Sequence, residues 1–312
     1  MHERRTYLIS FLRRSYLLLA VLFVVWVVIQ NGDDIRTLLS QFPVVPTYVI
    51  FVCLALALSS YVARALRWLG YMRHWETTRH GALHSLIYVS GFAFTTFPGK
   101  AGELMRGVHL SKLGVPFRFT LCSFVSERLL DVLVVSFVAS YFLVARMSVF
   151  FLIIPAIVVT TLLVSSLLLT HITTQKIRPE IKVILFELTY LWGRQLLLRS
   201  TLLTFLAWAL QGTVLFIFVS SLGAEISLSL AVSIYCVSLL LGAASMIPGG
   251  IGVTELGIVW LLGLVGVESD VAIVVAVLTR ALTLWPAVVC GLLSSIVLKK
   301  VISPSSIGDT ES

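Results

Sequence analysis

The chain has 312 residues, of which 58% are hydrophobic and 12% are charged. A soluble globular domain averages about 25% charged residues, so the composition excludes a soluble domain and predicts an all-α polytopic membrane protein. The net charge of +8 does not indicate nucleic-acid binding, because the basic residues flank apolar runs and form no clustered basic motif.

Apolar runs of roughly 17 to 25 residues, the length that crosses the hydrocarbon core, recur along the chain. The first run follows several arginines, as in a secretory signal, but no small-x-small cleavage site closes it, so we interpret it as an uncleaved span. Six full spans are predicted, at about 15–30, 46–63, 119–145, 148–171, 201–222 and 271–298.

Two further apolar stretches, about 82–97 and 227–247, each stop at a Pro-Gly pair. If the first stretch crossed the membrane, the basic groups on its two sides would lie on opposite faces, against the positive-inside rule. Each stretch is therefore predicted to form a re-entrant helical hairpin, one entering from each side. This topology places both termini and most Lys and Arg residues, including Arg64 and Arg67, on the cytoplasmic side.

The segments outside these spans carry less information. Residues 176–199 mix basic and apolar side chains, which predicts a helix in the cytoplasmic interface. Residues 303–312 are polar and predicted to be a disordered tail behind a single membrane domain over 1–302. The four cysteines lie inside apolar runs and are interpreted as small buried side chains, and neither a metal nor a cofactor is expected.

The motif Φ-P-G-x-x-G occurs twice, beginning at Phe97 and at Ile247, and an arginine in an apolar span follows each copy, Arg128 and Arg280. The two segments are predicted to be inverted repeats. Inverted repeats with broken helices at membrane depth are a recurring transporter design, with the substrate site at the repeat interface. The predicted repeats cover about 82–145 and 227–298.

A helix that restarts after Pro-Gly presents unpaired N–H groups and the positive end of its dipole, which favours an anion. Arginine inside the membrane costs at least about 3 kcal/mol, so Arg128 and Arg280 are predicted to contact or gate an anionic substrate. The alternative for Arg128 is a structural salt bridge with Asp131 or Glu127. The candidate substrate-binding residues are Pro98, Gly99, Lys100, Gly102, Glu103, Arg106, Glu127, Arg128, Asp131, Pro248, Gly249, Gly250, Gly252, Glu255 and Arg280.

Two features leave alternatives open. Charged or imidazole side chains recur every third residue from Lys100 to Lys112 and would sweep most of an α-helix's circumference, so part of this helix should meet water or protein within a cavity. The other interpretation is a solvated cytoplasmic helix. Glu255 could pair with an arginine across the repeat, carry a proton, or be a packing acid near the interface.

Three motifs together resemble a known family: Pro98-Gly99-Lys100-Ala101-Gly102-Glu103-Leu104-Met105-Arg106, Ser126-Glu127-Arg128-Leu129-Leu130-Asp131 and Pro248-Gly249-Gly250-Ile251-Gly252. The chain resembles the flippase-like transmembrane region of lysylphosphatidylglycerol synthases, over roughly residues 10 to 300. The resemblance implies movement of a phosphate-bearing lipid between leaflets. It does not imply lipid synthesis, since few residues follow Lys299-Lys300. With Pro98 aligned on Pro248, Gly250 replaces Lys100 and Val253 replaces Glu103, which argues against a symmetric role for these charges.

The sequence therefore predicts translocation of an anionic membrane lipid or a polyprenyl-phosphate-type lipid in the plasma membrane of a bacterium or archaeon. Homo-oligomerisation is left open, and no nucleotide-binding loop indicates ATP hydrolysis. One alternative is an enzyme that acts on a lipid phosphate or assists a glycosyltransferase, although no nucleophile or metal-ligand spacing is recognisable. The other alternative is an accessory subunit in the biosynthesis of envelope glycoconjugates.

Overall fold

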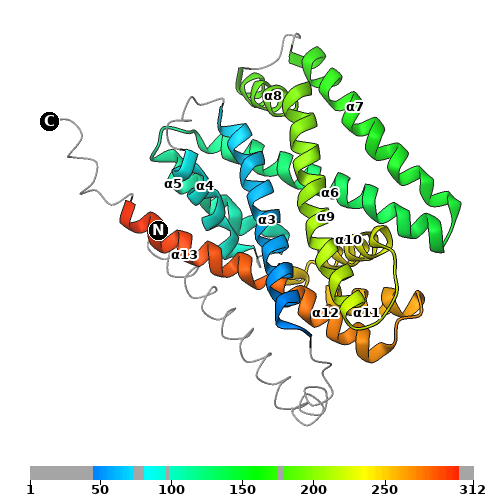
Figure 1. Ribbon diagram of the computed structural model, residues 1–312. Helices are drawn as coiled ribbons and strands as arrows, with labels where there is room; N and C mark the ends of the chain where they lie inside the picture. Colours follow the sequence, from blue (N-terminus) through cyan, green and yellow to red (C-terminus); the bar gives the residue numbers. More distant parts are fainter. Residues whose placement is uncertain (1–44, 74–80, 96–97, 174–178, 302–312) are drawn as a thin grey trace. The chain divides into compact units, whose positions relative to one another are not determined.

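The computed structural model describes residues 45–73, 81–95, 98–173 and 179–301, which belong to one compact unit and contain helices but no strand (Figure 1). Four helical stretches are long and apolar enough to cross a membrane: α3 (Thr47–Met72), α6 (Phe117–Arg146), α9 (Arg194–Ser221) and Ser269–Val301. They match four of the six predicted spans. The predicted span at 15–30 and the predicted tail at 303–312 lie outside the described residues.

The last of these stretches is not one straight helix. It consists of α12 (Ser269–Thr283) and α13 (Trp285–Val301), which are interrupted at Leu284. Pro286 lacks a backbone N–H, so it cannot continue the hydrogen-bond ladder from α12. The predicted span at 148–171 corresponds to η5 (Val149–Leu152) and α7 (Ile153–Thr173), and within it Val149–Ser165 is a shorter apolar helix.

Two predicted boundaries were wrong. Helix α3 continues to Met72, nine residues past the predicted end, and Arg64 and Arg67 are 6% and 1% exposed within it. These arginines are therefore part of the packed interior, and do not count as loop charges for the positive-inside rule. The predicted interfacial helix at 176–199 is α8 (Pro179–Leu191), and it stops because Gly193 adopts an extended backbone that begins α9.

Each Pro-Gly pair lies at the turn of a helical hairpin. In the first hairpin, α4 (Gly81–Ser90) and η3 (Gly91–Phe94) are followed by η4 (Pro98–Met105) and α5 (Arg106–Ser111). Helix α4 contacts α5, and η3 contacts η4, so the chain reverses direction. In the second hairpin, α10 (Leu228–Ala244) packs against α11 (Val253–Leu264) beyond η6 (Pro248–Gly250). Gly249, Gly250 and Gly252 have φ values of 65°, 62° and 86°, which L side chains rarely adopt.

The two hairpins are followed by the same local structure. Gly114 and Gly266 have φ values of 80° and 88°, and the N–H groups of Val115 and Val267 donate to the carbonyls of Leu110 and Leu262, both at 3.1 Å. The next long helix then begins at Phe117 in one case and at Ser269 in the other. A constant spacing of 152 residues relates all these positions, as it relates Arg128 to Arg280.

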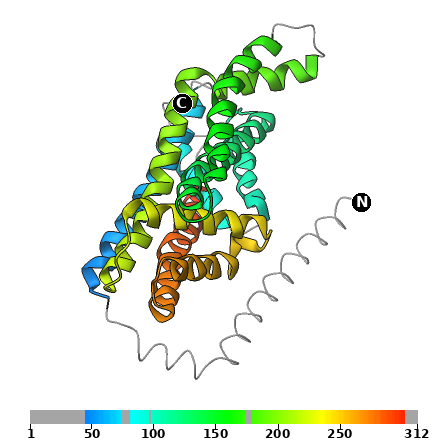
Figure 2. The same cartoon turned by 90° about the vertical axis from the view of Figure 1, so that its right-hand side faces the viewer.

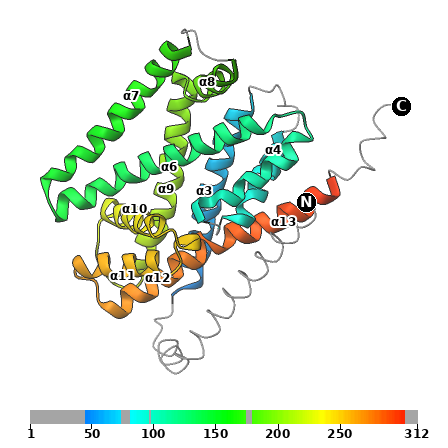
Figure 3. The same cartoon turned by 180° about the vertical axis from the view of Figure 1, so that it is seen from behind.

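Each hairpin packs against a long helix that follows the other hairpin in the chain. The second hairpin's α10 packs on α6, while the first hairpin's α4 and η3 pack on α13 (Figure 3). The contact with α13 is close, because a Cβ atom added at Gly291 would overlap Ala93 N and lie 2.6 Å from Phe92 C. The turn elements η4 and η6 also contact each other.

Helices α3 and α9 run side by side in opposite directions (Figure 2). Near one end of the contact Gly70 faces Leu196, and further along the Ser60 hydroxyl accepts a hydrogen bond from Gln211. The residue numbers rise along one helix as they fall along the other, as an antiparallel pair requires. Across the same contact, Arg67 of α3 donates a hydrogen bond to Thr204 of α9.

Candidate functional site

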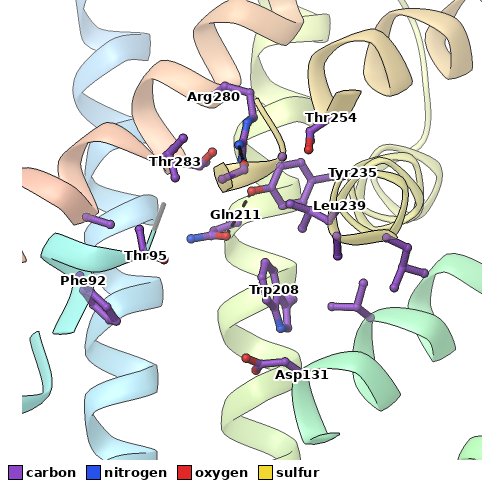
Figure 4. A pocket seen from close by; sticks show the side chains of 18 of the residues that line it. Phe92, Thr95, Asp131, Trp208, Gln211, Tyr235, Leu239, Thr254, Arg280 and Thr283 are labelled. Atoms are coloured by element: carbon purple, nitrogen blue, oxygen red, sulfur yellow. Dashed lines mark hydrogen bonds between the residues drawn. The ribbon is translucent and has the colours of Figure 1, made fainter. Parts of the chain in front are cut away.

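A cavity of about 350 Å³ lies where the two hairpins meet α3, α6, α9 and α12 (Figure 4). Both turns and both predicted arginines contribute to its wall. Its lining includes an arginine from α3, aromatic and amide side chains from α9 and α10, and glycines of the second turn. The charged and polar lining residues are Tyr61, Arg64, Tyr88, Thr95, Glu103, Arg128, Asp131, Gln211, Tyr235, Thr254, Arg280 and Thr283.

At the first hairpin, Arg128 contacts two carboxylates. Its Nη2 lies 3.1 Å from Asp131 Oδ2 on the next helical turn and 3.5 Å from Glu103 Oε2 on η4. The Arg128 side chain is 21% exposed, and its Nε has no hydrogen-bond partner among the described residues. Arg128 therefore forms the structural salt bridge that was one of the two predictions, and it also faces the cavity.

A second layer of ion pairs lies behind this one. Arg106 Nη2 is 2.6 Å from Glu127 Oε2, and its guanidinium lies 4.3 Å from the Trp68 ring centroid. Arg67 Nη1 is 3.0 Å from Asp131 Oδ1 and donates to Thr204 at 2.6 Å. Removing one partner of a buried ion pair leaves an uncompensated charge, which is strongly destabilising, so this layer fixes the carboxylates that Arg128 faces.

The solvated-helix alternative for the segment from Lys100 to Lys112 is wrong for two of its residues. Glu103 and Arg106 are buried and paired, whereas Lys112 is exposed. The prediction assumed an α-helix, but Pro98–Met105 is a 3₁₀-helix. Its period of three residues aligns side chains three positions apart, so Glu103 and Arg106 turn to the same side.

At the second hairpin, Arg280 joins the turn to α12. Its Nε donates to Glu255 Oε1 at 2.9 Å, and its Nη2 donates to the Gly249 carbonyl at 2.6 Å. The other Glu255 oxygen accepts the Gly252 N–H at 2.7 Å, which caps the start of α11. The anion at this helix N-terminus is thus the chain's own carboxylate, and Glu255 pairs with the arginine of its own repeat.

The two hairpins carry matching ion pairs. Glu103 precedes Arg128 by the same 25 residues that separate Glu255 from Arg280. The expected asymmetry, based on aligning Val253 with Glu103, was wrong for Glu103, because the second turn contains two more residues between its proline and its acid. It still holds for Lys100, which corresponds to Gly252 when the arginines are aligned. In the frame set by the arginines, Glu255 is the counterpart of Glu103.

Several cavity residues were missed by the sequence reasoning. Arg64 lies 4.0 Å from the Trp208 ring centroid and 3.9 Å from Asp131 Oδ2. Gln211, one turn further along α9, accepts from the Tyr235 hydroxyl at 3.2 Å. In Figure 4 the labelled Trp208 and Gln211 lie between Asp131 and Arg280. Two arginines three residues apart within an apolar run were the available signal for Arg64 and Arg67.

Apolar side chains form part of the cavity rim. Val132 on α6 is 54% exposed, and Met246 and Ile247 before the second turn are 64% and 43% exposed. Met246 has a φ of 54°, an uncommon value for a residue other than glycine, and this backbone turns the segment into Pro248. The cavity therefore combines charged side chains with exposed apolar ones, a combination that suits an amphiphile.

The predicted site residues fall into four groups. Glu103, Arg128, Asp131, Gly249, Gly250 and Arg280 line the cavity. Arg106, Glu127, Gly252 and Glu255 hold these residues through the contacts above, and Gly102 and Pro248 belong to the two turns. Pro98, Gly99 and Lys100 belong to η4, which contacts η6, but their side chains are outside the description. Across the described residues, no three His, Cys, Asp or Glu side chains are grouped to hold a metal ion.

The family model described as the lysylphosphatidylglycerol synthase TM region matches the chain over residues 15–291. No curated protein matches the chain. The match covers both hairpins, the helices that carry Arg128 and Arg280, and the whole lining of the cavity.

Proposed function

The chain belongs to the family of lysylphosphatidylglycerol synthase transmembrane regions, and from this premise we propose that it moves an anionic, phosphate-bearing lipid between the leaflets of the membrane. The family and the apolar helices make it a multi-pass membrane protein with a role connected to membrane lipids. Translocation is the step beyond that statement, and the cavity supports it.

One observation carries the proposal: the cavity combines arginines inside with exposed apolar side chains at its rim. A phosphate needs charged or N–H donors once it leaves water, and arginine offers several in a planar fork. Acyl chains need an apolar exit. A lipid with its headgroup beside Arg128 or Arg280 and its chains past Val132 and Met246 would satisfy both requirements.

The proposal takes the two hairpins as re-entrant, one from each side of a plasma membrane, with both termini cytoplasmic. The antiparallel pairing of α3 with α9 and the crosswise packing of α10 on α6 and α4 on α13 favour this arrangement. Each turn then lies at membrane depth, where irregular backbone is tolerated only if it is buried in protein or lines a cavity. A headgroup that enters from either leaflet would then meet one of the two arginines first.

In this mechanism the phosphate exchanges places with a carboxylate. The headgroup enters beside one arginine, replaces part of its carboxylate contact, passes Gln211 and Trp208, and reaches the other arginine. Hydrogen bonds to a charged group contribute about 1.5–3 kcal/mol each, so one arginine can hold a phosphate without trapping it.

Vesicles that contain the purified protein and a labelled phosphatidylglycerol in one leaflet test the proposal. The wild type should accelerate equilibration of the label, and Arg128→Gln should slow it by about tenfold or more, the factor expected for loss of one charged hydrogen bond. Arg146→Gln is the matched control, because Arg146 is exposed near the end of the same helix. Thermal unfolding of each variant shows whether it is folded.

Equal rates in protein-containing and empty vesicles would contradict translocation. Chemical conversion of the labelled lipid, detected by mass spectrometry, would instead support an enzyme acting on the lipid phosphate. If Arg128→Gln and Arg146→Gln slowed the label equally, the lipid would not pass through this cavity.

A further inference from the structure

The charges around the cavity do not cancel. Among the described residues, the cavity wall and the ion pairs directly behind it contain the arginines Arg64, Arg67, Arg106, Arg128 and Arg280. The carboxylates in contact with them are Glu103, Glu127, Asp131 and Glu255. Among these described side chains, five positive charges face four negative ones, so the cluster carries an excess of one positive charge.

The excess charge can be assigned to Arg64. Arg67, Arg106, Arg128 and Arg280 each have a carboxylate oxygen at 3.1 Å or less. The carboxylate that pairs with Arg64 lies 3.9 Å away and belongs to Asp131, which also pairs with Arg67 and Arg128. Its guanidinium lies over Trp208 and is part of the cavity wall. An aromatic face stabilises a cation but does not neutralise it.

An isolated charge away from water is costly, and a single negative charge in the cavity would remove the imbalance. We infer that the lipid headgroup carried by this cavity has one net negative charge, as in a phosphodiester lipid with an uncharged alcohol, and that Arg64 selects for it. This inference rests on the proposed function and adds the charge class of the substrate.

The charge count separates four lipid classes. Phosphatidylglycerol, with one negative charge, neutralises the cavity, whereas phosphatidylcholine brings no net charge. Lysylphosphatidylglycerol carries a net positive charge and would add to the excess. A lipid phosphate monoester or diphosphate carries about two or more negative charges at neutral pH and would overshoot. The preferred order is therefore phosphatidylglycerol first and lysylphosphatidylglycerol last.

The experiment compares labelled versions of phosphatidylglycerol, phosphatidylcholine, lysylphosphatidylglycerol and phosphatidic acid in otherwise identical vesicles. The wild type should move phosphatidylglycerol about tenfold faster than phosphatidylcholine, as expected when one charged hydrogen-bond partner is lost. In Arg64→Gln the charges balance, and this preference should fall to about twofold or less. Arg64→Lys keeps the charge and should keep the preference.

A second variant increases the excess of positive charge around the cavity. Glu103→Gln leaves two positive charges in excess, so phosphatidic acid should gain relative to phosphatidylglycerol. Arg146→Gln is the control for a lost surface charge, because Arg146 is exposed at the end of α6 and lies outside the cavity. The control should keep the wild-type order of lipids.

The outcomes distinguish this inference from the proposed function. If the wild type moves none of the four lipids, the proposed function fails. If it moves phosphatidylcholine or lysylphosphatidylglycerol as fast as phosphatidylglycerol, transport stands and the charge inference is wrong. If Arg64→Gln unfolds, the wild-type order and the Arg64→Lys and Glu103→Gln shifts decide the question. Inorganic phosphate that displaced a bound lipid completely would contradict a lipid site.

Discussion

In this structure Arg128 and Arg280 both form ion pairs with carboxylates of the chain itself. Each faces a carboxylate that lies 25 residues earlier in the chain and in its own hairpin, Glu103 on η4 and Glu255 in the first turn of α11. The Arg280–Glu255 pair is reinforced by two backbone contacts, with Gly249 and Gly252, whereas Arg128 divides its contacts between Glu103 and Asp131. The two ion pairs are equivalent in position but differ in strength.

This difference predicts a larger coupling energy at the second hairpin. Glu255→Gln leaves Arg280 without its carboxylate and should lower the thermal stability more than the double variant with Arg280→Gln. A double-mutant cycle should give a coupling of about 1–3 kcal/mol for Glu255 with Arg280, within the range for contacting residues. The coupling of Glu103 with Arg128 should be smaller, because Asp131 remains. Unfolding in detergent measures both, and additive effects at 255 and 280 would contradict the pairing.

The sequence could indicate which residues are unusual but not which ones meet. Arg128 and Arg280 stood out because arginine inside an apolar run is costly. Arg64 and Arg67 look like loop charges after a span, and only their long-range contacts with Asp131 and Trp208 explain why α3 continues through them. The match between Glu103 and Glu255 was missed because the two repeats were aligned on Pro98 and Pro248 and not on their arginines.

At the scale of elements, the Pro-Gly pairs predicted the turns correctly. A proline without an N–H, and in the second turn glycines with positive φ, end a helix for local reasons that a sequence displays. The sequence analysis did not predict the 3₁₀ geometry of η4, the interruption at Leu284 or the end of α8 at Leu191, although Pro286 and Gly193 were local signals for the last two. Gly291 is an example of a residue whose role the sequence does not show. A glycine is needed there because the backbone of η3 packs directly against it.

The re-entrant arrangement predicts which hairpin ends share a face of the membrane. Single cysteines at exposed positions of the first hairpin, Ala82→Cys and Lys112→Cys, should react with an impermeant maleimide from the same side. Cysteines at the ends of the second hairpin, Ser229→Cys and Glu268→Cys, should both react from the other side. The background carries Cys290→Ser, since the other three cysteines are buried.

Labelling of positions 82 and 112 from opposite sides would contradict re-entry of the first hairpin and make it a crossing segment. Labelling of all four positions from one side would contradict the opposite orientation of the two hairpins. The background without an added cysteine is the control, and it should remain unlabelled from both sides.

At the scale of the whole described unit, the cavity results from the relation between the two hairpins. Each hairpin packs on the long helix that follows the other one, so the turns meet and their arginines face one space. The repeated motif indicated two similar segments, and the family resemblance implied a lipid. Neither indicated that α9 would supply Trp208 and Gln211 between the arginines, because α9 lies outside both predicted repeats.

The most direct test of lipid movement through this cavity is to fill its mouth and measure the translocation rate of phosphatidylglycerol in vesicles. Ala243 lines the cavity and is exposed, whereas the neighbouring Ala244 is exposed but does not line it. Ala243→Trp should reduce the rate to nearly that of empty vesicles, while Ala244→Trp, with the same added volume on the same helix, should keep the wild-type rate. A wild-type rate in folded Ala243→Trp would contradict passage of the headgroup through the cavity.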